Sequence, residues 1–268
     1  MQNIGIIGCG WLGLPLAKSL LKDGFTVHGT TTSSDKIETL KNAGIKAYNI
    51  SLFEDRIEGP ISDFLHSLDI IVINVPPRLR GKKQESFVKK MSLLKNKIKT
   101  SLCSKIIFAS STAVYGNTTG IINEKTTVSP NTESGKQLVL SENMLLEDSS
   151  LQTTIIRFGG LIGPNRHPIT ILSGKTELKN GNASVNLIHL EDCISILKES
   201  ITNNWSNELI NAVYPSHPTK KEYYTQEAIK RGIVPPKYAD SPQDDSKRVS
   251  SYFLTNVKNY HFHTSIFT

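Results

Sequence analysis

Three glycines near the start of the chain have the spacing of a loop that binds phosphate groups. The pattern Gly-x-Gly-x-x-Gly at Gly8, Gly10 and Gly13 follows an apolar run, residues 4–7, and precedes apolar residues at helical spacing, residues 14–21. In the order strand, turn, helix, the first glycine permits a tight turn and the second lets backbone approach a pyrophosphate. The start of the helix favours the anion. The predicted cofactor contacts of this turn are Gly8, Gly10, Trp11, Leu12 and Gly13.

Hydroxyl side chains follow the second predicted strand, residues 25–29. An NAD site usually has Asp or Glu about 20 residues beyond the glycines, where the carboxylate accepts from the ribose 2′-hydroxyl. This chain has Thr31 there. The hydroxyls of Thr31, Thr32 and Ser33 and the Lys36 cation are suited to a 2′-phosphate, so we predict NADP, with NAD as the alternative. The cluster could also simply start a helix over 35–42.

A third group of candidates follows an apolar run at residues 69–75. A run without polar alternation is typical of a central parallel strand that is buried on both faces. In an open α/β sheet the carboxyl ends of the strands line the ligand crevice, so we expect the residues from Asn74 to Arg78, Val75 and Pro76 among them, near the cofactor. Arg78 follows them and is a candidate for holding an anionic substrate, although loop arginines are commonly just solvated.

The elements that must position these residues alternate between strand and helix. Strands are also predicted over 45–50, 105–110 and 153–157, and this alternation indicates a doubly wound parallel sheet, the Rossmann α/β fold. Beyond Gly163 the rhythm changes and the segments become irregular. We therefore expect residues 1–162 and 186–213 to form the dinucleotide-binding domain, and residues 163–185 and 214–268 a small C-terminal substrate lobe.

Composition narrows the class of protein. The chain has 268 residues, 38% hydrophobic and 21% charged, with a net charge of +7. The basic balance is not accompanied by a nucleic-acid-binding motif, and no stretch is apolar enough for a membrane span, so we expect neither partner. No secretory signal begins the sequence and its three cysteines lack metal-ligand or disulfide spacing, which favours the cytoplasm.

Several segments together resemble the extended short-chain dehydrogenase/reductase family, which includes nucleotide-sugar epimerases, dehydratases and reductases. Besides the glycine turn, they are residues 110–116 (SSTAVYG), 157–164 (RFGGLIGP), 186–192 (NLIHLED) and 247–250 (KRVS). The resemblance implies a cofactor contact at Ser110 and an activity as an oxidoreductase or epimerase. The family often pairs through helices such as those expected around 82–99 and 134–146, so a homodimer is a further possibility.

The family's Tyr-x-x-x-Lys dyad is missing from its usual place. In the family the Tyr transfers a proton, the Lys lowers its pKa and a Ser orients the reacting oxygen. Alignment puts Ser111 at the serine position, Ser134 at the Tyr position and Leu138 at the Lys position. A shifted alignment brings Lys136 into the place of the Lys. A Ser hydroxyl is a poor acid near neutral pH, so the chain resembles an atypical subgroup.

A different proton donor is then required for catalysis. His167, on the loop where lobe and crevice are expected to meet, has an unperturbed pKa suited to the task. Tyr115 and His189 are weaker candidates, because packing or a structural hydrogen bond explains each of them.

Two hypotheses remain. In the first, the chain is an NADP-dependent enzyme acting on a small polar or anionic substrate held by Arg78, Arg157 or Arg166. In the second, it is a non-catalytic nucleotide-binding regulator or sensor. Pockets at the switch point of such sheets normally serve ligands, which favours the enzyme.

Overall fold

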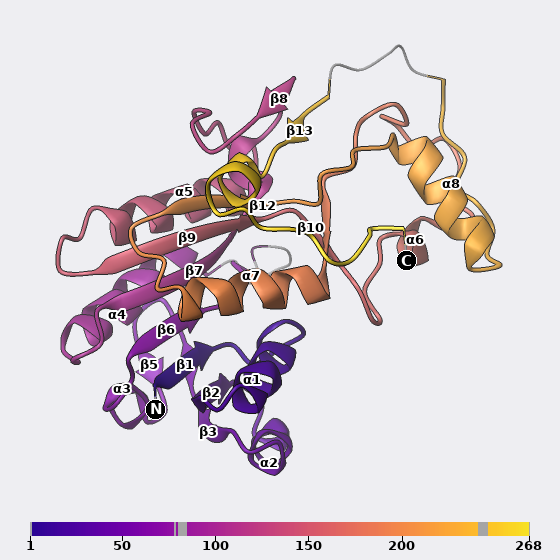
Figure 1. Cartoon of the computed structure of the whole chain (residues 1–268). Coiled ribbons are helices and arrows are strands. Elements are labelled where there is room, and N and C mark those ends of the chain that lie inside the picture. The colour runs from indigo at the N-terminus through magenta and orange to yellow at the C-terminus, as the bar shows by residue number, and fades with distance from the viewer. Residues whose placement is uncertain (1, 78, 80–84, 241–245, 268) are drawn as a thin grey trace. The chain divides into compact units, whose positions relative to one another are not determined.

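The computed structural model describes residues 2–77, 79, 85–240 and 246–267. A seven-stranded parallel sheet has the order β12-β9-β7-β6-β1-β2-β3, which confirms the predicted Rossmann architecture (Figure 1). Its strands are β1 (Asn3–Ile7), β2 (Thr26–Thr31), β3 (Lys46–Asn49), β6 (Ile70–Ile73), β7 (Lys105–Ser111), β9 (Gln152–Phe158) and β12 (Leu209–Ala212).

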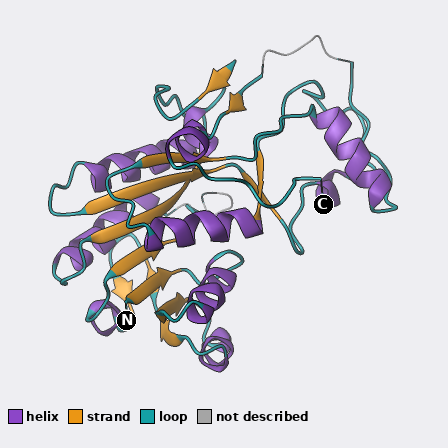
Figure 2. Cartoon of the chain, viewed as in Figure 1, coloured by secondary structure: helices purple, strands orange, loops and turns teal. Residues whose placement is uncertain are grey.

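Helices alternate with these strands along the chain (Figure 2). They are α1 (Gly13–Lys22), α2 (Asp35–Asn42), α3 (Ile61–Leu65), α4 (Phe87–Lys99), α5 (Glu133–Leu146), α6 (Ile169–Leu172), α7 (Leu190–Thr202) and α8 (Lys220–Lys230). The shorter elements are β4 (Ser51–Leu52), β5 (Ile57–Glu58), β8 (Ile121–Ile122), β10 (Gly160–Ile162), β11 (Leu187–His189), β13 (Arg248–Val249), a 3-10 turn (Thr112–Tyr115) and a π-turn (Phe253–Val257).

Burial explains why the central strands form where they do. All four residues of β6 are buried, and β6 pairs in parallel with β1 on one side and β7 on the other. An apolar strand without alternation needs such cover on both faces. Helix α4 buries one apolar stripe, whose members are Phe87, Met91, Leu94 and Ile98. Its lysines lie between these positions, as the 3.6-residue period requires.

The chain divides into two compact units. Unit 1 contains residues 1–114, 130–157 and 194–209, and unit 2 contains residues 115–129, 158–193 and 210–268. Unit 2 is larger than the expected substrate lobe because strand pairing ties additional segments to it. Residues 160–162 pair with 187–189, and residues 121–122 pair with 248–249.

Unit 2 has its own core, built from buried residues of β10, α6, β11, α8 and two loop segments. Its members are Ile162, Ile169, Val185, Leu187, Tyr223, Tyr224, Ala228 and Ile266. Helix α8 starts with a capping box between Thr219 and Glu222. The buried Asp192 carboxylate accepts from the Tyr260 hydroxyl and from the backbone N–H groups of His263 and Thr264, which fixes the C-terminal segment.

The described part of the chain lacks membrane-spanning helices and clusters of metal-ligating side chains. No helix there has both the length and the apolar character needed to cross a membrane. Within the same ranges, no three His, Cys, Asp or Glu side chains come together as metal ligands would.

Candidate functional site

The glycine turn between β1 and α1 is held by contacts from β2 and from the residue that follows β6. Gly8 has a φ of 101°, and its N–H donates to the Thr30 hydroxyl at 3.0 Å. The Asn74 side-chain amide donates to the Gly8 carbonyl at 3.1 Å. A Cβ on Gly13 would lie 2.2 Å from the Gly8 carbonyl oxygen. The fold itself therefore requires glycine at positions 8 and 13.

Gly10 differs from the other two glycines. A Cβ built there meets no heavy atom within 4 Å outside its immediate chain neighbours. Packing within the described chain therefore gives no reason for glycine at this position. A pyrophosphate lying against the turn does, because a side chain would occupy the place of the phosphate oxygens. The turn therefore fits a dinucleotide cofactor.

A cavity of about 210 Å³ begins at this turn. Its lining includes Gly8, Gly10, Thr31, Thr32, Ser33, Lys36, Val75 and Pro76, which are all predicted contacts. Trp11, Leu12 and Gly13 belong to the turn and the start of α1 but do not line the cavity. Among the described lining residues there are two cations, Lys36 and Lys90, and no carboxylate.

The end of β2 shapes one wall of the cavity. The buried Thr31 hydroxyl accepts from the Ser33 N–H at 3.2 Å, which curls the chain toward α2. This contact explains the Thr/Ser cluster locally and also turns the following side chains toward the cavity. Lys36 extends from the first turn of α2 and is exposed.

Sequence reasoning did not assign seven of the lining residues as contacts: Ile7, Cys9, Thr30, Ile50, Leu52, Phe87 and Lys90. Burial raises the pKa of the Cys9 thiol to about 12, so Cys9 is neutral near pH 7. Ile50, Leu52 and Phe87 give the wall an apolar character suited to a nucleobase. Ile50 could have been assigned from the sequence, because it ends the strand predicted over 45–50 and strand ends line the crevice. No local pattern marks Phe87 or Lys90.

Ser110 and Arg157 have partners inside unit 1. The Ser110 hydroxyl donates to the Glu142 carboxylate at 2.5 Å, and the Arg157 guanidinium donates to the same carboxylate at 2.6 Å through Nη2. Glu142 is 1% exposed and Arg157 is 4% exposed. The Arg157 charge is thus buried and neutralised within the fold. This pairing argues against the predicted contact of Arg157 with an anionic substrate, and the Ser110 hydroxyl has the same carboxylate as its partner.

The candidate catalytic residues Ser111 and Ser134 lie close in sequence to Ala113 and Gly135, which pack against each other. Gly135, next to Ser134 in the first turn of α5, packs so closely on the Ala113 carbonyl that a Cβ would lie 2.9 Å from it. Ser111, two residues before Ala113, accepts from the Ala113 N–H. Lys136 is exposed. Leu138, at the position of the family's Lys, is 4% exposed and belongs to the core.

His167 lies in the core of unit 2. It is 6% exposed, its Nε2 lies 2.9 Å from the Tyr223 hydroxyl, and its Nδ1 accepts from the Ile169 N–H. Burial, and secondarily the Arg231 charge, lowers its pKa to about 4. His167 is therefore neutral near pH 7, which argues against its predicted role as a general acid. Tyr115 is fully buried and donates to the Asn211 side chain at 2.9 Å.

The lowered pKa of His167 predicts an acid-sensitive unit 2. The unfolded chain binds this proton near pH 6.5 and the folded chain only near pH 4, so stability is lost as the pH falls through that window. The loss is roughly 3 kcal/mol. We expect His167→Asn to flatten this part of the pH profile in urea unfolding while any turnover persists. An unchanged profile, or loss of turnover, would contradict this structural role.

The two remaining arginine candidates are placed differently. Arg166 is exposed in a turn of unit 2, where its N–H donates to the Gly163 carbonyl at 3.0 Å. Arg78 lies outside the described residues.

Fold and turn together define a dinucleotide-binding Rossmann protein. Residues 3–153 match the family model of the NAD-binding domain of 6-phosphogluconate dehydrogenase. Protein YeeZ of Escherichia coli strain K12 is 34% identical over 242 residues, which cover 90% of this chain and 88% of YeeZ. The chain therefore belongs to this family of NAD-binding domains and is a relative of YeeZ.

Solved structures share the fold at lower identity. A functionally unknown conserved protein from Silicibacter pomeroyi DSS is 20% identical, with 97% of this chain and 93% of that chain covered and a TM-score of 0.77. UDP-glucuronic acid 4-epimerase from Bacillus cereus, solved with UDP-glucuronic acid and NAD, is 16% identical, with 98% and 95% covered and a TM-score of 0.81. These likenesses agree with the predicted Rossmann α/β fold.

Proposed function

We propose that this protein binds NADP(H) in the cavity at the glycine turn and acts on a small polar or anionic substrate in an oxidoreductase or epimerase-like reaction. The observation that carries the cofactor choice is the chemistry of the cavity lining. Its described residues include the hydroxyls of Thr31 to Ser33 and the cation of Lys36, and no Asp or Glu. A 2′-phosphate carries nearly two negative charges at neutral pH, so it favours donors and cations and is repelled by carboxylates.

Within this proposal, the residues around the Ala113 and Gly135 contact serve the reaction. The bound cofactor would supply or accept a hydride. Ser111 holds the reacting oxygen of the substrate, Ser134 donates a second hydrogen bond, and Lys136 holds the nicotinamide ribose. The proton donor is a group other than the usual Tyr, because Ser134 is too weak an acid for that step.

The alternative is a non-catalytic sensor of the cofactor, and the burial of Leu138 favours it. The Lys of the usual dyad works by placing a cation beside the Tyr and the ribose. A leucine that is 4% exposed in its place contributes packing instead. In this case cofactor binding changes the interactions of the protein and turns over no substrate.

Thr31→Asp tests the cofactor choice. Its carboxylate keeps an acceptor for the Ser33 N–H but repels a 2′-phosphate and accepts from a 2′-hydroxyl. We expect NADPH to bind at least about tenfold more weakly and the preference to turn toward NADH. Fluorescence titration with NADPH and with NADH measures the two affinities. Thr39→Asp, on the exposed side of α2, is the control and should retain the preference for NADPH. A Thr31→Asp variant that still prefers NADPH would contradict the proposal.

A crystal grown with NADP and a metabolite mixture tests the enzyme against the sensor. A ligand trapped beside the nicotinamide C4 supports the enzyme and names the substrate class. A closed apolar wall facing C4 would leave the sensor as the function.

A further inference from the structure

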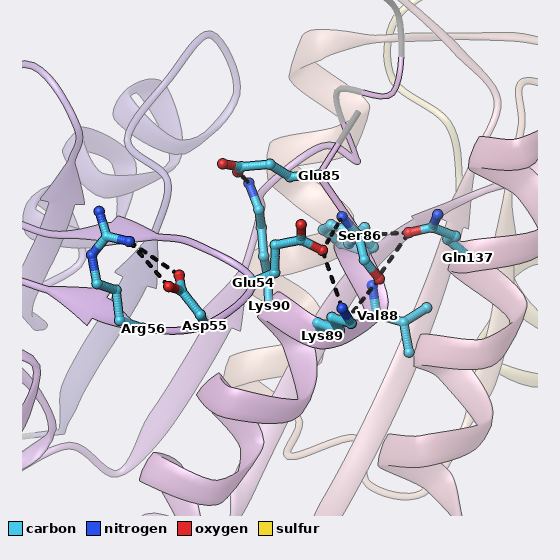
Figure 3. Close-up of polar contacts among 10 residues, drawn as sticks. Glu54, Asp55, Arg56, Glu85, Ser86, Val88, Lys89, Lys90 and Gln137 are labelled. Atoms are coloured by element: carbon cyan, nitrogen blue, oxygen red, sulfur yellow. Dashed lines mark hydrogen bonds and ion pairs between the residues drawn. The ribbon is translucent and has the colours of Figure 1, made fainter. Parts of the chain in front are cut away.

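The first turn of α4 is held by side chains from two other parts of unit 1 (Figure 3). The Ser86 N–H donates to the Glu54 carboxylate at 3.0 Å. The Gln137 side-chain oxygen, from α5, accepts from the Phe87 N–H at 2.6 Å and more weakly from the Val88 N–H at 3.4 Å. The start of a helix leaves such N–H groups without partners inside the helix, and here other side chains supply them.

The orientation of the Gln137 amide is fixed by a further contact. Its Nε2 donates to the Glu133 carboxylate at 2.7 Å, one turn earlier on α5. The carbonyl oxygen therefore faces α4 and the amide nitrogen faces the α5 surface. Gln137 links the helix that carries Ser134 and Lys136 to the helix that supplies one wall of the cavity.

These contacts limit how α4 can serve a ligand. A helix N-terminus attracts anions through its free N–H groups and its dipole. In α4 the Glu54 carboxylate already lies at this end, and Gln137 and Ser86 accept the next N–H groups. Helix α4 therefore contributes to the cavity through the side chains of Phe87 and Lys90.

Two adjacent lysines of α4 have different surroundings. The Lys89 side chain is 68% exposed, and its Nζ lies 3.7 Å from the Glu54 carboxylate. The Lys90 side chain is 21% exposed, lines the cavity and forms an ion pair with Glu85. Only one of these two cations is thus available inside the cavity, and it has a carboxylate partner that can move away when a stronger anion binds.

The position of Glu54 indicates which end of the cavity Lys90 occupies. Glu54 follows Leu52, a cavity residue at the end of β4, and contacts both Ser86 and Lys89. The first turn of α4 therefore lies near the wall formed by Ile50 and Leu52. In this fold the pyrophosphate lies at the glycine turn and the adenosine lies toward the ends of β2 and β3. The anionic group of the cofactor at that end is the 2′-phosphate.

We propose that Lys90, held in place by the Glu54 and Gln137 contacts of α4, is a specificity-determining residue that binds the 2′-phosphate together with Lys36. This inference rests on the proposed binding of NADP(H). On binding, the Lys90 ammonium exchanges the Glu85 carboxylate for the phosphate, whose charge is higher and whose oxygens accept more hydrogen bonds.

The test compares 2′,5′-ADP with 5′-AMP as ligands of the full-length protein. These probes differ in the 2′-phosphate alone. We expect Lys90→Gln to lower the affinity for 2′,5′-ADP at least about tenfold, as measured by calorimetry. Its affinity for 5′-AMP should stay within about twofold of that of the wild-type protein. Glu85→Gln should increase the affinity for 2′,5′-ADP, because it removes the carboxylate that competes with the phosphate for Lys90. Lys89→Gln is the matched control and should bind both probes as wild type does.

Each outcome separates this inference from the proposed function. If wild type prefers 2′,5′-ADP and Lys90→Gln keeps that preference, the role of Lys90 is wrong and NADP binding stands. An equal loss for both probes would place Lys90 on the shared part of the ligand and also overturn its role. If the wild-type protein binds the two probes equally well, the choice of NADP is wrong. If Lys90→Gln then also has wild-type affinities for both probes, the role of Lys90 is wrong as well.

Discussion

Replacing Gly10 with valine is expected to abolish dinucleotide binding while the protein still folds. The added side chain enters space in which no atom of the described chain lies within 4 Å of the new Cβ, so packing is preserved. The same space is where the pyrophosphate must approach the backbone. We expect the affinity for NADPH to fall at least about 100-fold, measured by fluorescence titration. The urea unfolding midpoint should stay close to that of wild type.

Two variants make this expectation specific to Gly10. Gly13→Val places its Cβ 2.2 Å from the Gly8 carbonyl oxygen, so it should lower the unfolding midpoint as well as the affinity. Lys18→Val adds the same side chain to the exposed side of α1 and should bind NADPH normally. Normal binding by Gly10→Val would mean that the cofactor does not lie on this turn.

The second large effect is expected at the buried pair of Glu142 and Arg157. Glu142→Gln keeps the size of the side chain but leaves the Arg157 charge unpaired at 4% exposure and weakens the Ser110 contact. Breaking one side of such a buried ion pair costs about 3 to 5 kcal/mol. We expect a decrease of this size in the free energy of unfolding from urea titration.

Two further variants test whether the loss of stability comes from the unpaired charge of Arg157. Glu142→Met combined with Arg157→Met removes both charges and should recover much of the stability, because an apolar pair of similar volume avoids desolvation of the ions. Glu38→Gln affects an exposed pair with Lys41 on α2 and should leave stability unchanged. A Glu142→Gln variant as stable as Glu38→Gln would show that the buried pair is not important for the fold.

Local sequence patterns predicted much of the fold because the features concerned are local. The apolar run that became β6 has no alternation, and the helix predicted over 35–42 begins and ends as α2 does. The glycine turn needs only its own spacing and the flanking periodicity. The structure adds the reasons for its glycines, since Thr30 in β2 and Asn74 directly after β6 hold the turn.

The remaining features depend on pairs of residues far apart in the sequence. Arg157 looked available for a substrate because Glu142, which neutralises it, lies on another element. His167 was predicted to be an acid because the sequence around it does not show its burial. That burial comes from Tyr223 on the distant helix α8. No local pattern marked Lys90, because its place in the cavity depends on where Glu54 and Gln137 fix α4. Spacing along the chain carries no signal for these contacts.

The proposed function requires the cavity at the glycine turn to bind a phosphorylated dinucleotide. Titration of the wild-type protein with NADPH and with NADH, followed by cofactor fluorescence, measures this binding. We expect saturable binding of one NADPH per chain with at least about tenfold weaker binding of NADH. Equal affinities would contradict the assignment of the residues from Thr31 to Lys36 to the 2′-phosphate, and no binding of either cofactor would contradict the site itself.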